Sequence, residues 1–192
     1  NIILADDGLQ HYRLQRDLEL VIIDGKRKFG NGLLLPAGPL REGVWRLSTA
    51  DIVIVNGGEP QEVITNNQLS MTLNASHVCH LLTGELTPIA EFIHESSTVN
   101  AIAGIGSPER FFNTLEQQQF SLNESLGFVD HHHFTLADFA HFNDKLPLLM
   151  TEKDAVKCKP FAKDNWWYLP VKAEIATTEL AYLKEKITDL TQ

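Results

Sequence analysis

The sequence predicts an α/β protein with a partial parallel sheet, a β-hairpin connector and a second small α/β lobe. Short runs rich in Val and Ile lie at Ile2–Leu4, Leu18–Ile23 and Ile52–Val55, without clear alternation of apolar and polar residues. That pattern is typical of strands that are buried on both faces of a parallel sheet. From Val99 onward, strand-like and helix-like segments alternate, which indicates a second layered α/β unit.

Two segments interrupt the predicted strands. The segment Gly25–Ala50 contains Gly-Asn-Gly and Pro-Ala-Gly-Pro, so we expect an ordered functional loop rather than a helix. After Asn56 the chain becomes polar, with an alternating run over 69–73 that could pair with a second run near Val78–Leu82. We interpret this stretch as a hairpin-like connector; the alternative is a disordered linker, although its content of Leu, Met and Val is high for one.

The predicted second lobe begins with a strand at Val99–Ile105. Ser107 and Pro108 then suit the N-cap and first position of a helix, and capping boxes begin at Thr135 and Thr151. Further expected elements are strands at Leu146–Met150 and Trp166–Val171 and a final amphipathic helix along Leu180, Leu183, Ile187 and Leu190. We therefore divide the chain into a core part (1–56), a β connector (57–98) and a C-terminal α/β lobe (99–192).

Composition bounds the possible functions. The net charge is −9, but residues 1–56 are neutral with seven basic and seven acidic side chains. No extended basic face emerges, which disfavours binding of nucleic acid. Cys79 and Cys158 form neither a zinc motif nor a disulfide scaffold. The chain opens at Asn1 in a strand-like run, without a signal peptide or an apolar membrane span, and we expect a soluble C-terminal part of a longer protein.

Asp6 and Asp7 directly follow the first apolar run. Adjacent carboxylates at the end of a buried strand suit a Mg²⁺ site next to phosphate, and P-loop kinases place an aspartate at such a strand end. The following residues add the amide of Gln10 and the imidazole of His11. No G-x-x-x-x-G-K-[ST] phosphate loop occurs in the sequence. The alternative is that the pair only forms a turn at a strand end.

A second constellation is Asp130-His131-His132-His133, directly before a predicted helix start. Three consecutive histidines do not share one face, so they are not a ready metal site. One of them could pair with a carboxylate and tune it, as histidine does in proton-transfer sites. The alternative is a polar loop with a cap-forming aspartate.

Taken together, these motifs resemble the tetraacyldisaccharide 4'-kinase family, the lipid A 4'-kinases. The similarity spans nearly the whole chain in the family's order, and it rests on the following motifs: Asp6-Asp7-Gly8-Leu9-Gln10-His11, Ile23-Asp24-Gly25, Phe29-Gly30-Asn31-Gly32, Leu35-Pro36-Ala37-Gly38-Pro39-Leu40-Arg41-Glu42, Ala103-Gly104-Ile105-Gly106, Arg110-Phe111-Phe112, Asp130-His131-His132 and Met150-Thr151-Glu152-Lys153-Asp154-Ala155-Val156.

The resemblance implies a two-lobed P-loop-kinase-like fold with a small β connector. It implies transfer of the ATP γ-phosphate to the 4'-hydroxyl of an acylated glucosamine disaccharide 1-phosphate, in lipid A biosynthesis at the cytoplasmic face of the bacterial inner membrane. It also implies that the phosphate loop and the aspartate proposed as base lie in the family's N-terminal part. We therefore expect this chain alone to be inactive.

The resemblance also assigns roles to individual residues. It implies that Asp6 and Asp7 lie near Mg²⁺ in the active site and are catalytic. Gln10, His11, Arg41 and Glu42 match substrate-binding loops next to them, and either His131 or His132 matches a catalytic histidine that contacts the base. Two other functions stay open on the residues alone: a metal-dependent phosphohydrolase that uses Asp6, Asp7 and the histidines, and a non-catalytic module that binds sugar phosphates.

Overall fold

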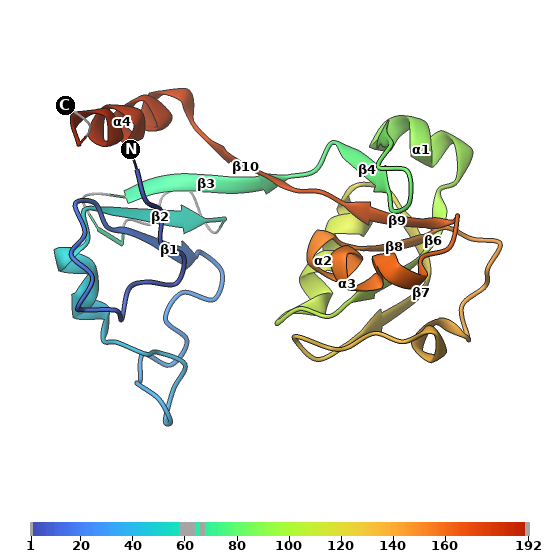
Figure 1. Cartoon of the computed structure of the whole chain (residues 1–192), viewed down its shortest axis with the longest axis horizontal. Helices are drawn as coiled ribbons and strands as arrows, with labels where there is room; N and C mark the ends of the chain where they lie inside the picture. The colour runs from blue at the N-terminus through green and yellow to red at the C-terminus, as the bar shows by residue number, and fades with distance from the viewer. Residues whose placement is uncertain (1, 58–63, 66–67, 191–192) are drawn as a thin grey trace. The chain divides into compact units, whose positions relative to one another are not determined.

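The computed structural model describes residues 2–57, 64–65 and 68–190 (Figure 1). The chain forms two compact units: unit 1 comprises Asn1–Asn74 and Ala173–Gln192, and unit 2 comprises Ala75–Lys172. The α/β class with parallel sheets is confirmed. None of the described helices is both long enough and apolar enough to cross a lipid bilayer.

Unit 1 is built on a four-stranded sheet with the order β1-β2-β3-β10. The elements of this unit are β1 (Leu20–Asp24), the 3₁₀ helix η1 (Val44–Thr49), β2 (Ile52–Asn56), β3 (Gln68–Asn74), β10 (Lys172–Ile175) and α4 (Thr177–Asp189). Strand β2 is parallel to both β1 and β3, with Leu20 opposite Ile52. The predicted strands around Leu18–Ile23 and Ile52–Val55 are thus confirmed.

The sheet of unit 1 is covered on both faces. Val53 and Val55 pack with Ile23 and Ala50 on one face. On the other face Ile52 and Ile54 pack with Leu69, Ile175 and Leu183, so β10 and α4 complete this core. This explains why β2 reads as a continuous apolar run rather than an alternating one.

The expected strand at Ile2–Leu4 does not form. These residues have no regular secondary structure, and Ile3 and Leu4 are 95% and 91% exposed. Apolar residues with high β propensity form a strand only when a neighbouring strand accepts their backbone hydrogen bonds. Within the described residues β1 is an edge strand bonded to β2 alone, so this run has no neighbour to pair with.

Unit 2 contains a six-stranded sheet with the order β5-β4-β9-β8-β6-β7. Its elements are β4 (His77–His80), β5 (Leu86–Pro88), α1 (Ile89–Glu95), β6 (Thr98–Ala103), α2 (Pro108–Gln117), β7 (Ser121–Gly127), η2 (Leu136–Phe139), β8 (Leu148–Thr151), α3 (Glu152–Cys158), η3 (Lys159–Phe161) and β9 (Trp166–Leu169). Strands β7, β6, β8 and β9 are parallel neighbours, and β4 is antiparallel to β9 and β5.

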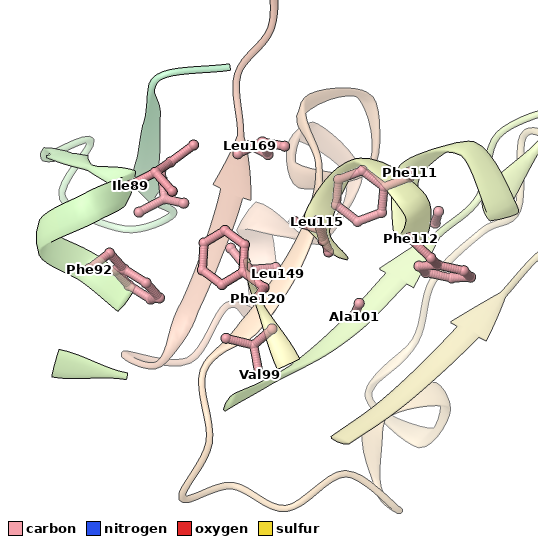
Figure 2. Packing of buried hydrophobic residues seen from close by; sticks show 12 residues of the cluster. Ile89, Phe92, Val99, Ala101, Phe111, Phe112, Leu115, Phe120, Leu149 and Leu169 are labelled. Carbon is pink, nitrogen blue, oxygen red and sulfur yellow. The ribbon is translucent and has the colours of Figure 1, made fainter. Parts of the chain in front are cut away.

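Alternate residues of the central strands of unit 2 point to opposite faces. On one face Val99, Ala101 and Leu149 pack under aromatic and aliphatic side chains of α1 and α2 (Figure 2). On the other face Ile102 and Met150 pack with residues of η2 and α3. The two clusters form a core that extends along the whole parallel part of the sheet.

Three details differ from the sequence prediction. Strands β3 and β4 do not pair with each other, because β3 lies between β2 and β10 while β4 lies between β5 and β9. The capping box at Thr135 is present, but it starts a single 3₁₀ turn rather than a longer helix. The predicted segments 1–56, 57–98 and 99–192 are continuous, whereas unit 1 is discontinuous, since Ile175 and Leu183 pack on β2 and β3.

Candidate functional site

The loop before β1 carries the first candidate site. It is a chain of turns in which the backbone N–H of His11 donates to Gly8 O at 2.9 Å. Asp7 lies in the left-handed region with φ of 50°, which aspartate tolerates better than most residues with a side chain. Strained backbone of this kind gathers at functional sites, so Asp7 fits such a site.

Arg41 connects this loop to the segment after β1. Its Nη1 donates to both carboxylate oxygens of Asp7, at 2.9 and 3.0 Å, and contacts Oε1 of Gln10 at 3.3 Å. The Arg41 and Asp7 side chains are 59% and 70% exposed. Asp7 and Gln10 therefore meet Arg41, more than thirty positions further along the chain, at an accessible surface.

A cavity of about 220 Å³ lies beside this cluster. Gln10, Arg41 and Glu42 contribute to its polar wall together with Asp24, Lys28 and Arg46. The other lining residues are mostly apolar: Leu9, Val21, Ile22, Ile23, Phe29, Leu40, Gly43, Val44 and Leu47. An apolar pocket with a few convergent polar groups is the usual form of a small-molecule site.

Glu42 is held at the inner side of this site. Its side chain is 12% exposed, and its Oε2 lies 3.3 Å from Nε of Arg46. The Glu42 carboxylate raises the pKa of the exposed Tyr12 phenol. Gln10, Arg41 and Glu42 therefore line the cavity, and Asp7 joins them only through its contact with Arg41. Asp6 and His11 are exposed and do not line it.

The carboxylate pair suits Mg²⁺ by its donor chemistry. Mg²⁺ is usually held by one or two carboxylates, with water and phosphate oxygens in the remaining positions. Asp6 is exposed and Asp7 shares its oxygens with Arg41, so both lie at the surface where such a ligand could enter. Across residues 2–57, 64–65 and 68–190, no group of three or more His, Cys, Asp or Glu side chains could hold a metal alone.

The histidine loop follows β7 at the carboxyl ends of the parallel strands of unit 2, where open α/β sheets usually bind ligands. Lys153 Nζ donates to Asp130 Oδ1 at 2.9 Å and thereby lowers the pKa of Asp130. His131 has φ of 63°, and its side chain is 79% exposed. His131 is thus the second predicted site residue, after Asp7, whose backbone is in the left-handed region.

His132 has a different environment from its neighbour. Its ring stacks on Phe128 at a centroid distance of 4.5 Å and meets the edge of Phe134 at 4.8 Å. Its Nε2 lies 3.4 Å from Oδ2 of Asp138, and the side chain is 26% exposed. Both histidines therefore lie near a carboxylate, since His131 Nε2 is 3.7 Å from Asp130 Oδ2, but only His132 is packed against aromatic rings, whereas His131 is exposed.

The sequence interpretation missed one polar residue that organises this edge of unit 2. Asp154 is fully buried and accepts hydrogen bonds from Gly104 N at 2.8 Å, Thr151 Oγ1 at 2.7 Å and Lys157 Nζ at 3.1 Å. It links the end of β6 to the start of α3. The capping box beginning at Thr151 was the available signal, but it did not show the contact with Gly104.

Comparison with known proteins gives a consistent result. The sequence profile of the family described as tetraacyldisaccharide-1-P 4'-kinase matches residues 1–190. A tetraacyldisaccharide 4'-kinase of Colwellia psychrerythraea is 58% identical over 194 residues, which cover 100% of this chain and 55% of that protein. Another, of Psychromonas ingrahamii, is 50% identical over 190 residues, with 99% and 56% covered.

A solved structure is similar as well. The crystal structure of LpxK from Aquifex aeolicus in complex with ATP matches with a TM-score of 0.72 and 27% identity, over 95% of this chain and 55% of that one. The chain thus spans about half the length of the relatives that it matches.

Proposed function

The chain belongs to the tetraacyldisaccharide-1-P 4'-kinase family, and we propose that it supplies part of the active site of such a kinase. The complete protein would transfer the γ-phosphoryl group of ATP to the 4'-hydroxyl of a tetraacyldisaccharide 1-phosphate. The 4'-oxygen forms a bond to phosphorus, the bond from phosphorus to the bridging oxygen breaks, ADP leaves, and a base accepts the hydroxyl proton.

One observation carries this proposal. Asp7, Gln10 and Arg41 converge beside a cavity at the end of β1, on two loops that only the fold brings together. Phosphoryl transfer depends on positioning and on stabilisation of charge at the phosphate oxygens. The exposed ion pair between the Arg41 guanidinium and the Asp7 carboxylate is suited to both tasks, because Arg41 can bind phosphate oxygens while it orients Asp7.

Asp6 and Asp7 would hold Mg²⁺ in the complete kinase, as their position and donor type suit this ion. When bound, the ion would neutralise negative charge on the phosphate oxygens. Gln10, His11, Arg41 and Glu42 would contact the substrates. Glu42 is the most buried of these, so its role would be to hold the Arg41 segment against Arg46.

Of the histidines, we assign the catalytic contact to His131 rather than His132. The His131 side chain is 79% exposed beside Asp130, while the His132 ring packs against Phe128 and Phe134 and is only 26% exposed. A catalytic imidazole must be able to reach the group that it orients. We place the activity of the complete kinase at the cytoplasmic face of the inner membrane, because its substrate is an acylated lipid.

The decisive experiment is a kinase assay of the complete protein that contains this chain. Radiolabelled ATP and the tetraacyldisaccharide 1-phosphate are incubated with the wild type and with Arg41→Ala. We expect labelled product that depends on Mg²⁺, and at least a tenfold lower kcat/KM in the variant. Arg13→Ala, in an exposed position of the same loop, is the matched control and should behave as wild type. Absence of labelled product with the wild type would refute the proposal.

A further inference from the structure

Glu19, directly before β1, joins two arginines that come from opposite sides of the candidate site. Its Oε1 accepts from Arg16 Nη1 and from Arg46 Nη2, both at 2.6 Å. The Glu19 and Arg46 side chains are only 11% and 12% exposed, and Arg16 is 22% exposed. Charge-assisted hydrogen bonds that are partly shielded from water are stronger than exposed pairs.

Each arginine extends to one loop of the site. Arg16 donates to Leu9 O from Nη1 at 3.1 Å and to His11 O from Nη2 at 3.0 Å, so it holds the backbone on both sides of Gln10. Arg46 lies 3.3 Å from Glu42, the residue next to Arg41. Glu19 is thus the common partner of the two loops that bring Gln10 and Arg41 together.

Glu19 is itself fixed to the sheet. Its backbone N–H donates to Asp51 Oδ2 at 2.8 Å, and its carbonyl accepts from Ile52 N at 3.2 Å. The carboxylate is therefore anchored at the start of β2. The hydrogen bond that Glu19 accepts from Arg46, together with its negative charge, raises the pKa of the Arg46 guanidinium.

We infer that Glu19 is a positioning residue that sets the distance between the Gln10–His11 turn and the Arg41–Glu42 segment. The inference rests on the proposed kinase function, because it assigns Glu19 a role in aligning that site. Without the carboxylate, Arg16 and Arg46 would share a neutral acceptor and repel each other. The repulsion would move both loops and misalign Arg41 with Asp7, although Glu19 touches neither residue.

Kinetics of the complete kinase test this inference. We expect Glu19→Gln to lower kcat by about 10²-fold, as misplacement of a catalytic group by about 1 Å does, with a smaller change in KM for ATP. Asp17→Asn is the matched control, because this exposed residue carries the same charge in the same segment. It should keep wild-type kcat and KM. Glu19→Asp keeps the charge on a shorter side chain, should fall between these values, and replaces Glu19→Gln if that variant does not fold.

A double-mutant cycle separates positioning from a merely structural role. If Glu19 acts through Arg16, then Glu19→Gln combined with Arg16→Ala should lower kcat no further than the more severe single variant. Additive effects, or a lowered thermal midpoint with unchanged kcat below it, would overturn the inference.

Hydrogen exchange makes the failure of this inference distinguishable from the failure of the proposed function. In Glu19→Gln of the complete protein, amides of residues 8–14 and 40–47 should exchange faster, while those of β2 stay protected. Unchanged exchange in both loops would overturn the positioning role, whatever the protein catalyses. Faster exchange in a protein without kinase activity would support the positioning role and reject only the function.

Discussion

Both units bury apolar side chains on the two faces of their sheets, but unit 1 leaves more large apolar side chains exposed and joins its loops through charged groups. In unit 2, Leu149, Met150 and Trp166 are at most 2% exposed. In unit 1, Ile22 on the edge strand β1 is 64% exposed, and Trp45 on η1 is 68% exposed.

The two candidate loops follow this difference. The geometry of Asp7 and Arg41 depends on ion pairs between segments, while the histidine loop is fixed by Phe128 and Phe134 around His132. Apolar packing fixes the position of a side chain because neighbouring side chains fill the space around it, and an ion pair fixes it through attraction to a charged partner. Substitutions in unit 2 should therefore act mainly on stability, and substitutions in the charged part of unit 1 mainly on catalysis.

The largest effect is expected from Leu149→Ala in the central strand β8. Leu149 is fully buried in the cluster under α1 and α2. Replacing a buried leucine by alanine typically costs about 2–5 kcal/mol, because apolar contacts are lost and a cavity remains. Denaturant unfolding of the chain measures this loss. Val156→Ala on α3, where the side chain is 74% exposed, should change stability by less than about 0.5 kcal/mol. Similar values for both variants would contradict the continuous core of unit 2.

The next effect concerns the charged cluster of unit 1. Asp7→Asn in the complete kinase should lower kcat by about 10²-fold, since a preorganised charged group stabilises charge that develops in the transition state. KM for the lipid should change less. The thermal midpoint should not move, because Asp7 is 70% exposed. Asp189→Asn, an exposed charge on α4, is the control. Wild-type kinetics in Asp7→Asn would mean that Asp7 serves only in a turn, and would contradict the expectation that substitutions in unit 1 act mainly on catalysis.

Local signals predicted most of the regular elements. Val- and Ile-rich runs give β1 and β2, and Ser107 and Pro108 are the N-cap and first residue of α2 as expected. The failures have a common cause. Ile2–Leu4 has the composition of a strand but no neighbouring strand in the described structure, and strand pairing depends on contacts that sequence spacing does not encode.

The candidate site shows the same limit. Asp7 and Gln10 were predictable from their motif, but their contact with Arg41 spans more than thirty positions and depends on the fold of the loop after β1. The sequence could not distinguish His131 from His132, because the difference lies in tertiary contacts with Phe128 and Asp138. The roles of all these residues in catalysis stay predictions.

Smaller effects on kcat and on stability should distinguish the roles of His131, His132 and His133. His131→Ala in the complete kinase should lower kcat by about tenfold, less than the ~10²–10⁴-fold that direct general acid–base catalysis contributes, because the histidine orients the base rather than replacing it. Stability should change little. His132→Ala should instead lower stability by about 1 kcal/mol through loss of its aromatic contacts. His133→Ala is the control, because this side chain is exposed. Kinetics and thermal midpoints of all three variants test the assignment, and a larger kcat loss at His132 than at His131 would reverse it.

The smallest effect is a pH dependence that arises in unit 2, where a charged group supports the packed loop. Hydrogen bonds from the Thr135 backbone N–H and hydroxyl, at 2.7 and 3.0 Å, lower the pKa of Asp138 from its ordinary value, and His132 contributes in the same direction. Because the folded state lowers this pKa, the carboxylate stabilises the fold at pH values above about 4, and this contribution is lost as the pH falls through the folded pKa.

The difference in unfolding free energy between wild type and Asp138→Asn should therefore be largest near pH 7 and shrink below pH 4, as urea unfolding at several pH values would measure. Asp144→Asn is the control, because the Asp144 side chain is 68% exposed and takes no part in the capping box, and its difference from wild type should be smaller. A constant difference for Asp138→Asn between pH 7 and pH 3 would mean that the capping box holds the loop by shape alone, and unit 2 would then owe its stability to packing even at its charged edge.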